Sequence, residues 1–438
     1  MKFKFYCGIL FFFLVAHKLH AQSSRILHDL YKLRNSTTVL YLAAHPDDEN
    51  TRMISWLTNG YGARTAYLSL TRGDGGQNLI GKELGPELGV LRTQELLHAR
   101  RIDGGEQFFS RAVDFGYSKT ADETLEKWDR KAVLSDVVYV IRKFRPDVII
   151  TRFPPDSRGG HGHHTASAML GIEAFKSAAD PDAFPEQLER VDTWQPKRIY
   201  WNASTWWNPK LDSLAKVDDQ YLSAEVGGYS SLLGTSYNEL ASMSRTQHKS
   251  QGFGVSVDRG QQAEYLMYLA GEKAQTNLFE GISTSWERFG FKEGDKLLQK
   301  IIRDYDAMDP QKSVPTMLEL RKASVAIKDD AKRAYFREET DRILKDMLGL
   351  HLEALSEREF VSRGEKLELE VKILQRSALE ETISLDHIEW RSQKEDVNKA
   401  VEAAHKQKLA ATGRRRDRQP PTHVMRLLPV HLTGFGIQ

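Results

Sequence analysis

The sequence predicts an α/β fold, with a Rossmann-like, mostly parallel sheet and flanking helices. Two short segments, 37–44 and 145–153, are apolar almost without interruption, which indicates strands that are buried on both faces. Segments with helical spacing of apolar residues follow these strands or stand between them, at 85–100, 124–144 and 164–178. Strands that alternate with helices in this way are typical of a parallel sheet.

Further elements are predicted before residue 300, and from about 180 onward the pattern is mixed. We predict a helix in 49–62, then a strand in 63–76 that ends in a glycine turn. The apolar segment 196–204 predicts a last strand, and 258–274 predicts a helix. We assign 22–300 to one domain.

The C-terminal part follows a different pattern. Apolar residues recur at helical spacing throughout 314–357, so we predict a helical spacer over 301–358. The next segment, 359–377, alternates strictly around a glycine and resembles the opening of a β-sandwich. Alternation stops after Trp390, and too little chain remains for the roughly seven strands of such a fold. We therefore expect an incomplete β segment and a disordered tail over 359–438, and hypothesise a truncated or frame-disrupted version of a longer protein.

Composition indicates a globular protein without a charged macromolecular partner. The chain has 438 residues, of which 40% are hydrophobic and 28% charged, with a net charge of +2. This balance does not argue for nucleic acid or for an anionic membrane as a partner, and we expect no nucleic-acid partner. The sequence gives no indication of the oligomeric state.

The first residues have the pattern of an export signal. Lys2 and Lys4 precede an apolar run over 5–16, and Ala21 offers a small residue at a cleavage site. The run is too short to span a bilayer, so we expect a cleaved signal over 1–21, with an N-terminal anchor as the alternative. The mature chain would be periplasmic or extracellular, without stable membrane insertion. Because Cys7 is the only cysteine, neither disulfides nor thiolates would hold its site together.

Two polar clusters follow two of the predicted strands. "HPDDE" (45–49) comes directly after the strand in 37–44, and "GGHGHH" (159–164) comes shortly after the strand in 145–153. Parallel strands end at the same edge of a sheet, and ligand sites form there. Either cluster alone is more often a solvated turn or a surface loop. Together they predict one site.

The residue types in the two clusters suit a catalytic metal. Zinc in such sites takes three protein ligands and leaves one position to water. His45 and Asp48 are three residues apart and can point inward from one turn, and His164 can supply the third ligand. Asp47 then remains as a general base for a water activated by the metal, and a protonated His161 near the metal would stabilise a developing oxyanion. We take His163 as a bystander.

Four blocks in order resemble a known family. They are "AAHPDDE", "TRGDGG", "LGVLRTQEL" and "RPDVIIT…HGHHTAS", within residues 36–180, with a later similarity in "RTQHKSQGFG" (245–254). These blocks resemble the PIG-L/LmbE-like zinc-dependent N-acetylglucosaminyl deacetylases. The resemblance implies the same roles for the metal ligands, the base and His161, and it implies that Arg92 faces the substrate. The usual second motif of the family is His-Pro-Asp-His, whereas this chain has Gly162 and His163 in the middle, which leaves support of the metal site uncertain.

Weaker candidates surround this set. Asp74 in the glycine-rich turn could hold a sugar hydroxyl, although a plain turn explains the glycines equally well. His248 and Gln251 could line the pocket or fix a helix against it. Trp206 and Trp207 could stack on sugars, although tryptophan is more often part of the core.

The predicted function is that of an exported metal-dependent hydrolase that removes acetyl from an N-acetylated amino sugar, a GlcNAc-type glycan or glycoconjugate. Zinc is the expected metal, although the ligand set also accepts Fe²⁺, Co²⁺ or Mn²⁺. One alternative is an amidase that acts on larger N-acyl conjugates with the same site. Another is a carbohydrate-binding protein whose metal site has decayed.

Overall fold

The computed structural model describes residues 22–254, 256–356, 358, 367–377, 384–390, 393–400 and 405–411. The predicted signal over 1–21 and the end of the predicted tail, 412–438, lie outside the described residues. Among the described residues, no helix has both the length and the apolar character needed to cross a membrane.

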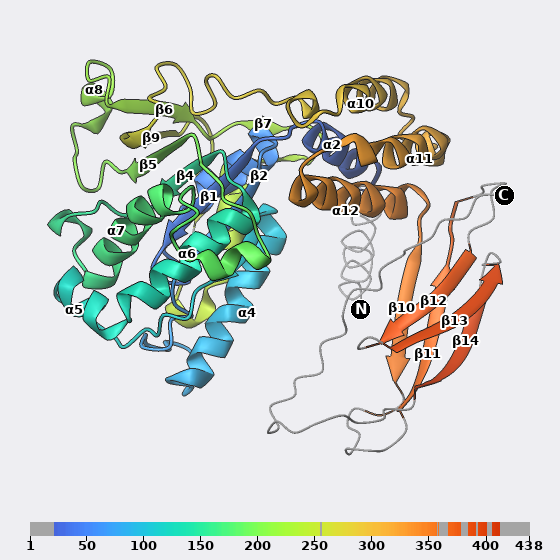
Figure 1. The fold of residues 1–438 in the computed structure, drawn as a ribbon, viewed down its shortest axis with the longest axis horizontal. Helices are drawn as coiled ribbons and strands as arrows, with labels where there is room; N and C mark the ends of the chain where they lie inside the picture. Colours follow the sequence, from blue (N-terminus) through green and yellow to red (C-terminus); the bar gives the residue numbers. More distant parts are fainter. Residues whose placement is uncertain are drawn as a thin grey trace, which may run out of the picture. The chain divides into compact units, whose positions relative to one another are not determined.

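From α2 to β5, helices and strands alternate except for the consecutive pair α5 and α6 (Figure 1). The helices are α2 (Gln22–Leu33), α3 (Thr51–Ser55), α4 (Pro86–Asp103), α5 (Ala121–Lys127), α6 (Arg130–Phe144), α7 (Gly162–Ser177), α8 (Leu211–Leu214), α9 (Tyr237–Arg245), α10 (Lys292–Asp304), α11 (Val314–Ala323) and α12 (Asp330–Met347). The strands are β1 (Thr38–Ala43), β2 (Arg64–Ser69), β3 (Glu106–Phe109), β4 (Val148–Thr151), β5 (Arg198–Ala203), β6 (Tyr221–Glu225), β7 (Tyr229–Ser230), β8 (Thr235–Ser236), β9 (Ala263–Gly271), β10 (His351–Ser356), β11 (Leu367–Leu374), β12 (Ser384–Trp390), β13 (Gln393–Ala400) and β14 (His405–Ala411).

The main sheet has the strand order β3-β2-β1-β4-β5-β9-β6. The five strands from β3 to β5 pair in parallel, and β9 pairs antiparallel with both β5 and β6. The predicted α/β class with a mostly parallel sheet is therefore confirmed. The chain moves outward from β1 through β2 to β3 and then returns to the other side of β1 as β4. This reversal creates a topological switch point between β1 and β4.

Helices cover both faces of this sheet. One core joins β1 and β2 to α6 and α7 through side chains such as Leu42, Leu68, Val137 and Leu170. The other core joins the opposite side chains of β1 and β2, such as Tyr41 and Tyr67, to α3 and α4. All six residues of β1 are buried, as expected for a strand that is covered on both faces.

Three predicted helices are wrong in whole or in part. The segment 258–274 contains strand β9 instead of a helix, between Gly260 and Gly271, whose φ values are +96° and +92°. The helix predicted over 124–144 breaks at Asp129, which has φ +51° and whose side chain accepts a hydrogen bond from the N–H of Ala132 at the start of α6. The predicted helical stretch 314–357 ends at Met347, and Gly349 with φ +59° leads into β10.

Strands also continue beyond the point where alternation stops. β10, β11 and β14 form an antiparallel sheet, and β12 pairs with β13. Strands β13 and β14 thus lie in the part of 359–438 where the sequence lacks alternation.

The chain divides into two compact units. One contains 28–295 together with 326–333, and the other contains the remaining described residues. The predicted boundaries at residues 300 and 358 stay predictions.

Candidate metal centre and active site

The predicted site lies at the switch point of the sheet. The "HPDDE" loop follows β1, and "HGHH" leads into α7 after β4, the strand that pairs with β1. The "TRGDGG" turn follows β2, and the loop over 110–120 follows β3. Four neighbouring parallel strands thus bring their following loops to one edge, which is where ligand sites form in such sheets.

The "HPDDE" loop is a tight turn held by its own polar groups. The Asp48 carboxylate accepts a hydrogen bond from the His45 backbone N–H at 2.7 Å. The Tyr67 hydroxyl donates to the His45 carbonyl at 2.5 Å. Asp47 has φ +97°, a conformation that costs a non-glycine residue energy and that persists only where its surroundings hold it.

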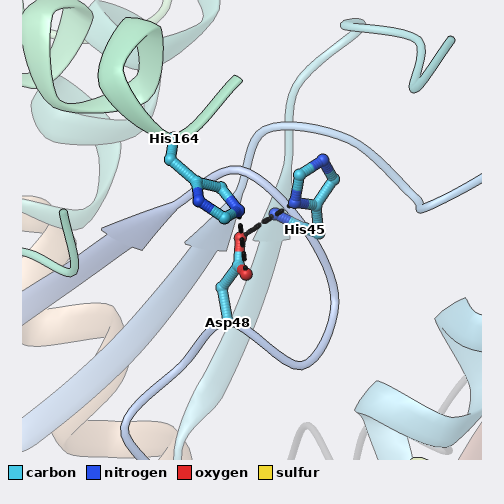
Figure 2. Close-up of side chains that lie close together, drawn as sticks. All are labelled: His45, Asp48 and His164. Carbon is cyan, nitrogen blue, oxygen red and sulfur yellow. Dashed lines mark hydrogen bonds and ion pairs between the residues drawn. The ribbon is translucent and has the colours of Figure 1, made fainter. Parts of the chain in front are cut away.

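Three predicted metal ligands converge in the structure (Figure 2). His45 Nδ1 lies 3.1 Å from Asp48 Oδ2, and His164 Nε2 lies 3.5 Å from Asp48 Oδ1. Figure 2 shows the carboxylate of Asp48 between the two imidazoles. Burial opposes ionisation of Asp48, but His164 and His45 more than offset this and hold the pKa of the carboxyl well below its usual value.

This donor set fits a divalent metal. Two imidazole nitrogens and one carboxylate are the ligand types that catalytic zinc sites use, and all three candidate ligand atoms lie within 4.8 Å of one another. The three side chains are between 12% and 21% exposed, so the centre is open on one side. These three side chains could therefore hold a metal and leave access for a further ligand.

Asp47 points to Arg92 beside this centre. Its Oδ1 accepts a hydrogen bond from Arg92 Nη2 at 2.7 Å, and its backbone carbonyl accepts one from Arg245 at 3.1 Å. Burial raises the pKa of Asp47 to about 6, although the Arg92 charge opposes the rise.

The buried carboxylate of Glu49 fixes the backbone of Asp47 through a hydrogen bond. Glu49 Oε2 accepts the Asp47 N–H at 2.9 Å, while Oε1 lies 2.8 Å from His248 Nε2 and 3.3 Å from Arg100. Glu49 and His248 are buried, and burial opposes ionisation of Glu49, but His248 and Arg100 lower its pKa to about 2. The structure thus places His248 behind the "HPDDE" loop, where it contacts Glu49.

His161 is the N-cap of α7, and its ring lies next to those of His45 and His164, at centroid distances of 5.5 and 4.9 Å. Its Nδ1 accepts the His163 backbone N–H at 3.0 Å, and the Ser118 backbone N–H points at its Nε2 from 3.4 Å. A neutral imidazole has only one nitrogen without a hydrogen, so these two contacts cannot both be hydrogen bonds. The shorter contact, at Nδ1, is the better one, which leaves the ring proton on Nε2. Burial, aided by His164 and His45, lowers the pKa of His161 to about 4, so the ring is neutral rather than protonated as we expected.

Arg92 and Asp74 lie among the loops. Arg92 is 4% exposed and donates to the carbonyls of Pro46 and Gly73 as well as to Asp47, so it ties the loop after β1 to the turn after β2. Asp74 accepts from Arg72 at 2.9 Å and lies against Gly89, where an added Cβ would approach its Oδ1 to 2.1 Å.

The glycines of the "TRGDGG" turn permit close packing. A Cβ on Gly73 would lie 2.4 Å from the guanidinium of Arg92, and a Cβ on Gly75 would lie 2.2 Å from the backbone nitrogen of Gly116. These two glycines therefore make room for neighbouring groups.

Residues 40–175 match the model of the PIG-L family, described as GlcNAc-PI de-N-acetylase. This part of the chain is a PIG-L family domain. The matched residues include most of β1, all of β2, β3 and β4, and both polar clusters.

Curated relatives of the PIG-L domain are similar over about a third of this chain. The mycothiol S-conjugate amidase of Streptomyces coelicolor is 30% identical over 36% of this chain and 58% of that protein. The diacetylchitobiose deacetylase of Thermococcus kodakarensis is 33% identical over 33% of this chain and 51% of that protein. The matched region thus spans little more than half of each of these relatives. Among solved structures, the N,N'-diacetylchitobiose deacetylase from Pyrococcus horikoshii is 19% identical, with a TM-score of 0.37, and the match covers 49% of this chain and 70% of that chain.

Sequence reasoning missed two buried residues of the PIG-L domain. His163, which we took as a bystander, is fully buried with its Nδ1 2.9 Å from His45 Nε2, and Asp114 lies beside both rings. Together with His45, these two residues form a second group that could hold a metal. The only sequence signal for Asp114 was its position shortly after β3. That strand has four residues and is only partly buried, so it lacks the continuous apolar run that identifies a buried strand.

The remaining candidates lie farther from the centre. Gln251 donates to the carbonyl of Gln77 at 2.8 Å and so holds the turn after β2. Trp207 lies edge-on to Phe153, whose ring stacks on His164 at 3.7 Å. Trp206 is 81% exposed and contacts Trp207.

Proposed function

We propose that this protein is a metal-dependent hydrolase that removes the acetyl group from an N-acetylated amino sugar. The observation that carries the proposal is the convergence of His45, Asp48 and His164 beside Asp47, at the switch point of the sheet. Membership of the PIG-L family supports the deacetylase reaction over residues 40–175. The names of the relatives, which include a chitobiose deacetylase, support an N-acetylated sugar as substrate.

A divalent metal held by His45, Asp48 and His164 would polarise an amide carbonyl and lower the pKa of a water molecule. We propose zinc, which is typical of this family. Asp47 lies directly beside the ligand Asp48 and accepts the proton of the attacking water. Its carboxylate is ionised above its raised pKa of about 6, so it is available as a base at neutral pH.

We propose that His161 stabilises the oxygen atom of the amide that becomes negative during the reaction. With Nδ1 occupied by the His163 backbone N–H, the ring proton sits on Nε2. We propose that this Nε2–H turns from the Ser118 N–H, 3.4 Å away, and donates to the oxygen that becomes negative when the amide carbonyl is attacked. After the amide bond breaks, the proton held by Asp47 passes to the leaving amine, and acetate is released. The neutral ring therefore acts as a hydrogen-bond donor and keeps its proton.

Exposed aromatic rings near the centre support a sugar as substrate. Tyr117 is 69% exposed, and its ring meets that of His161 at a centroid distance of 5.0 Å. Trp206 offers a second exposed ring beyond Trp207 and Phe153. Flat apolar faces with a polar edge are suited to stacking on a sugar ring. We propose that Tyr117 contacts the sugar next to the acetamido group.

A second candidate is hydrolysis of a larger N-acyl conjugate. Its support is the similarity to the mycothiol S-conjugate amidase. The same metal ligands and the same base would serve both reactions, so the two candidates differ only in the groups that the substrate presents.

We further propose that the protein is exported to the periplasm or the cell exterior, on the basis of the charged start, apolar run and small residue within 1–21. Fractionation of cells that express the full chain would test this. Activity and a shortened chain in the exported fraction support export, and a full-length chain in the cytosol contradicts it.

An acetate-release assay tests the proposed reaction. The full chain is incubated with N-acetylglucosamine, N,N'-diacetylchitobiose and a GlcNAc-lipid, beside a matched His164→Ala variant. Acetate from at least one sugar with the wild type alone supports the proposal. No acetate from any of the three, with metal bound, favours the larger conjugates.

A further inference from the structure

His45 has two ring nitrogens, and they face different groups. Nδ1 faces Asp48 and the proposed metal position, as described above. Nε2 points the other way and lies 2.9 Å from Nδ1 of His163. His163 is completely buried, with its ring 4.4 Å from Phe115 and 4.8 Å from Trp128 between centroids.

Proton accounting fixes the roles of the two rings. A contact of 2.9 Å between two ring nitrogens requires one of them to carry the hydrogen and the other to accept it. If Nδ1 of His45 binds a metal, its proton sits on Nε2, so His45 donates and His163 accepts at Nδ1. His163 then carries its own proton on Nε2, which finds no hydrogen-bond partner among the described residues and is enclosed by aromatic rings.

Asp114 places a negative charge beside this pair. Its Oδ1 lies 3.7 Å from His163 Nδ1 and its Oδ2 lies 4.0 Å from His45 Nε2. Oδ1 also accepts the Gly116 N–H at 2.9 Å, which fixes the carboxylate in place. At these distances Asp114 makes no direct hydrogen bond to either ring, so it acts on them through its charge.

The alternative is that the metal binds to His45, Asp114 and His163 instead. These three also bring their ligand atoms together. However, His163 is fully buried and the Asp114 side chain is 5% exposed, so that group is closed to water and substrate. A catalytic metal needs an open position, which the group with Asp48 and His164 offers.

We propose that His163 and Asp114 are positioning residues for the metal ligand His45. His163 accepts the Nε2–H of His45, which holds the ring in the tautomer and orientation that present Nδ1 to the metal, and Asp114 strengthens this donation. This inference rests on the proposed metal site. Partners of this kind typically contribute 10- to 100-fold to metal affinity.

Zinc affinity of the full chain, measured by competition with a chelator, tests the inference. Asn offers an acceptor near the position of Nδ1 and Leu offers none, so His163→Leu should weaken zinc binding about 10- to 100-fold. His163→Asn should bind within a few-fold of the wild type. Asp114→Asn keeps the acceptor for the Gly116 N–H but removes the charge, and should weaken binding by less than His163→Leu.

Several results would overturn the inference. Equal zinc affinity for His163→Leu and the wild type would do so. A second such result is that His163→Leu, in the presence of chelator, melts at a lower temperature than the wild type but binds zinc as tightly. That result would indicate that His163 contributes to packing alone. If His164→Ala retains zinc and His163→Asn loses it, the metal occupies the buried group. Failure of the proposed function is a separate result, in which the expected order of zinc affinities appears but no acetate is released.

Discussion

Lys332 lies in a fully enclosed position at the amino-terminal edge of the sheet. Its side chain is 1% exposed, and its Nζ donates to Thr38 Oγ1 at 3.0 Å and to the Arg145 carbonyl at 3.1 Å. The rings of Trp194 and Phe289 are 5.7 and 5.5 Å from Nζ. The segment 326–333 is thereby anchored to the unit that contains the candidate site.

Burial makes the charged form of this lysine costly. Burial lowers the pKa of Lys332 to about 7, an effect that Asp147 and Asp329 oppose and that the charges of Arg64 and Arg288 reinforce. In the unfolded chain the pKa returns to about 10.4. Between these two values the unfolded chain holds a proton that the folded chain has released. Folding stability therefore rises with pH across this window.

The expected size of the effect follows from the two pKa values. Each unit of pH changes the free energy of unfolding by up to about 1.4 kcal/mol per proton, and the folded lysine is half deprotonated at pH 7. From pH 7 to pH 9, Lys332 should contribute about 2 kcal/mol of added stability. Lys332→Met has a similar volume and no charge, so it should lack this contribution.

Guanidinium denaturation followed by tryptophan fluorescence, at pH 7, 8 and 9, measures the effect. The quantity of interest is the change in stability with pH for the wild type minus the same change for Lys332→Met. This difference cancels the other titrating groups and the two lost hydrogen bonds. Parallel pH dependences for the two proteins would refute the argument that Lys332 is buried with a lowered pKa.

Three further predictions concern the site and its surroundings. Asp47→Asn should keep bound zinc and lower kcat for acetate release at least about 100-fold, and unchanged turnover would exclude Asp47 as the base. Gly75→Ala should destabilise the fold by about 1–3 kcal/mol in chemical denaturation, because the new Cβ meets the Gly116 nitrogen at 2.2 Å, while Gly254→Ala, with open space around it, should change stability by less than about 0.5 kcal/mol. Equal stabilities would contradict the close packing. Tyr117→Ala should raise KM for diacetylchitobiose several-fold with little change in melting temperature, and an unchanged KM would remove Tyr117 from the substrate.

The central sheet could be predicted because its strands are buried on both faces. Continuous apolar runs at β1 and β4 leave little ambiguity, and the polar clusters after them are placed together by the rule that parallel strands end at one edge. This reasoning found the convergence of His45, Asp48 and His164.

Periodicity failed where an apolar run fits both kinds of element. The nine residues of β9 are apolar enough for a buried helix, and only pairing with β5 and β6 makes them a strand. The break at Asp129 likewise depends on a backbone conformation that the composition of the segment does not reveal.

The interior of the site could not be predicted because it depends on packing between loops. The sequence gives no sign that His163 turns inward toward His45, or that the loop after β3 brings Asp114 beside both. The role of Glu49 is similar, since its carboxylate contacts Asp47, His248 and Arg100 only after α4 and the segment near 248 have packed against the loop.

The most direct test of the central claim is metal-dependent acetate release by a chain that has been stripped with a chelator and then titrated with zinc. The account predicts that activity disappears with the metal and returns at about one zinc per chain, and that His164→Ala recovers neither the zinc nor the activity. Full acetate release by the metal-free chain, or recovery by His164→Ala, would contradict the claim that His45, Asp48 and His164 hold a catalytic metal.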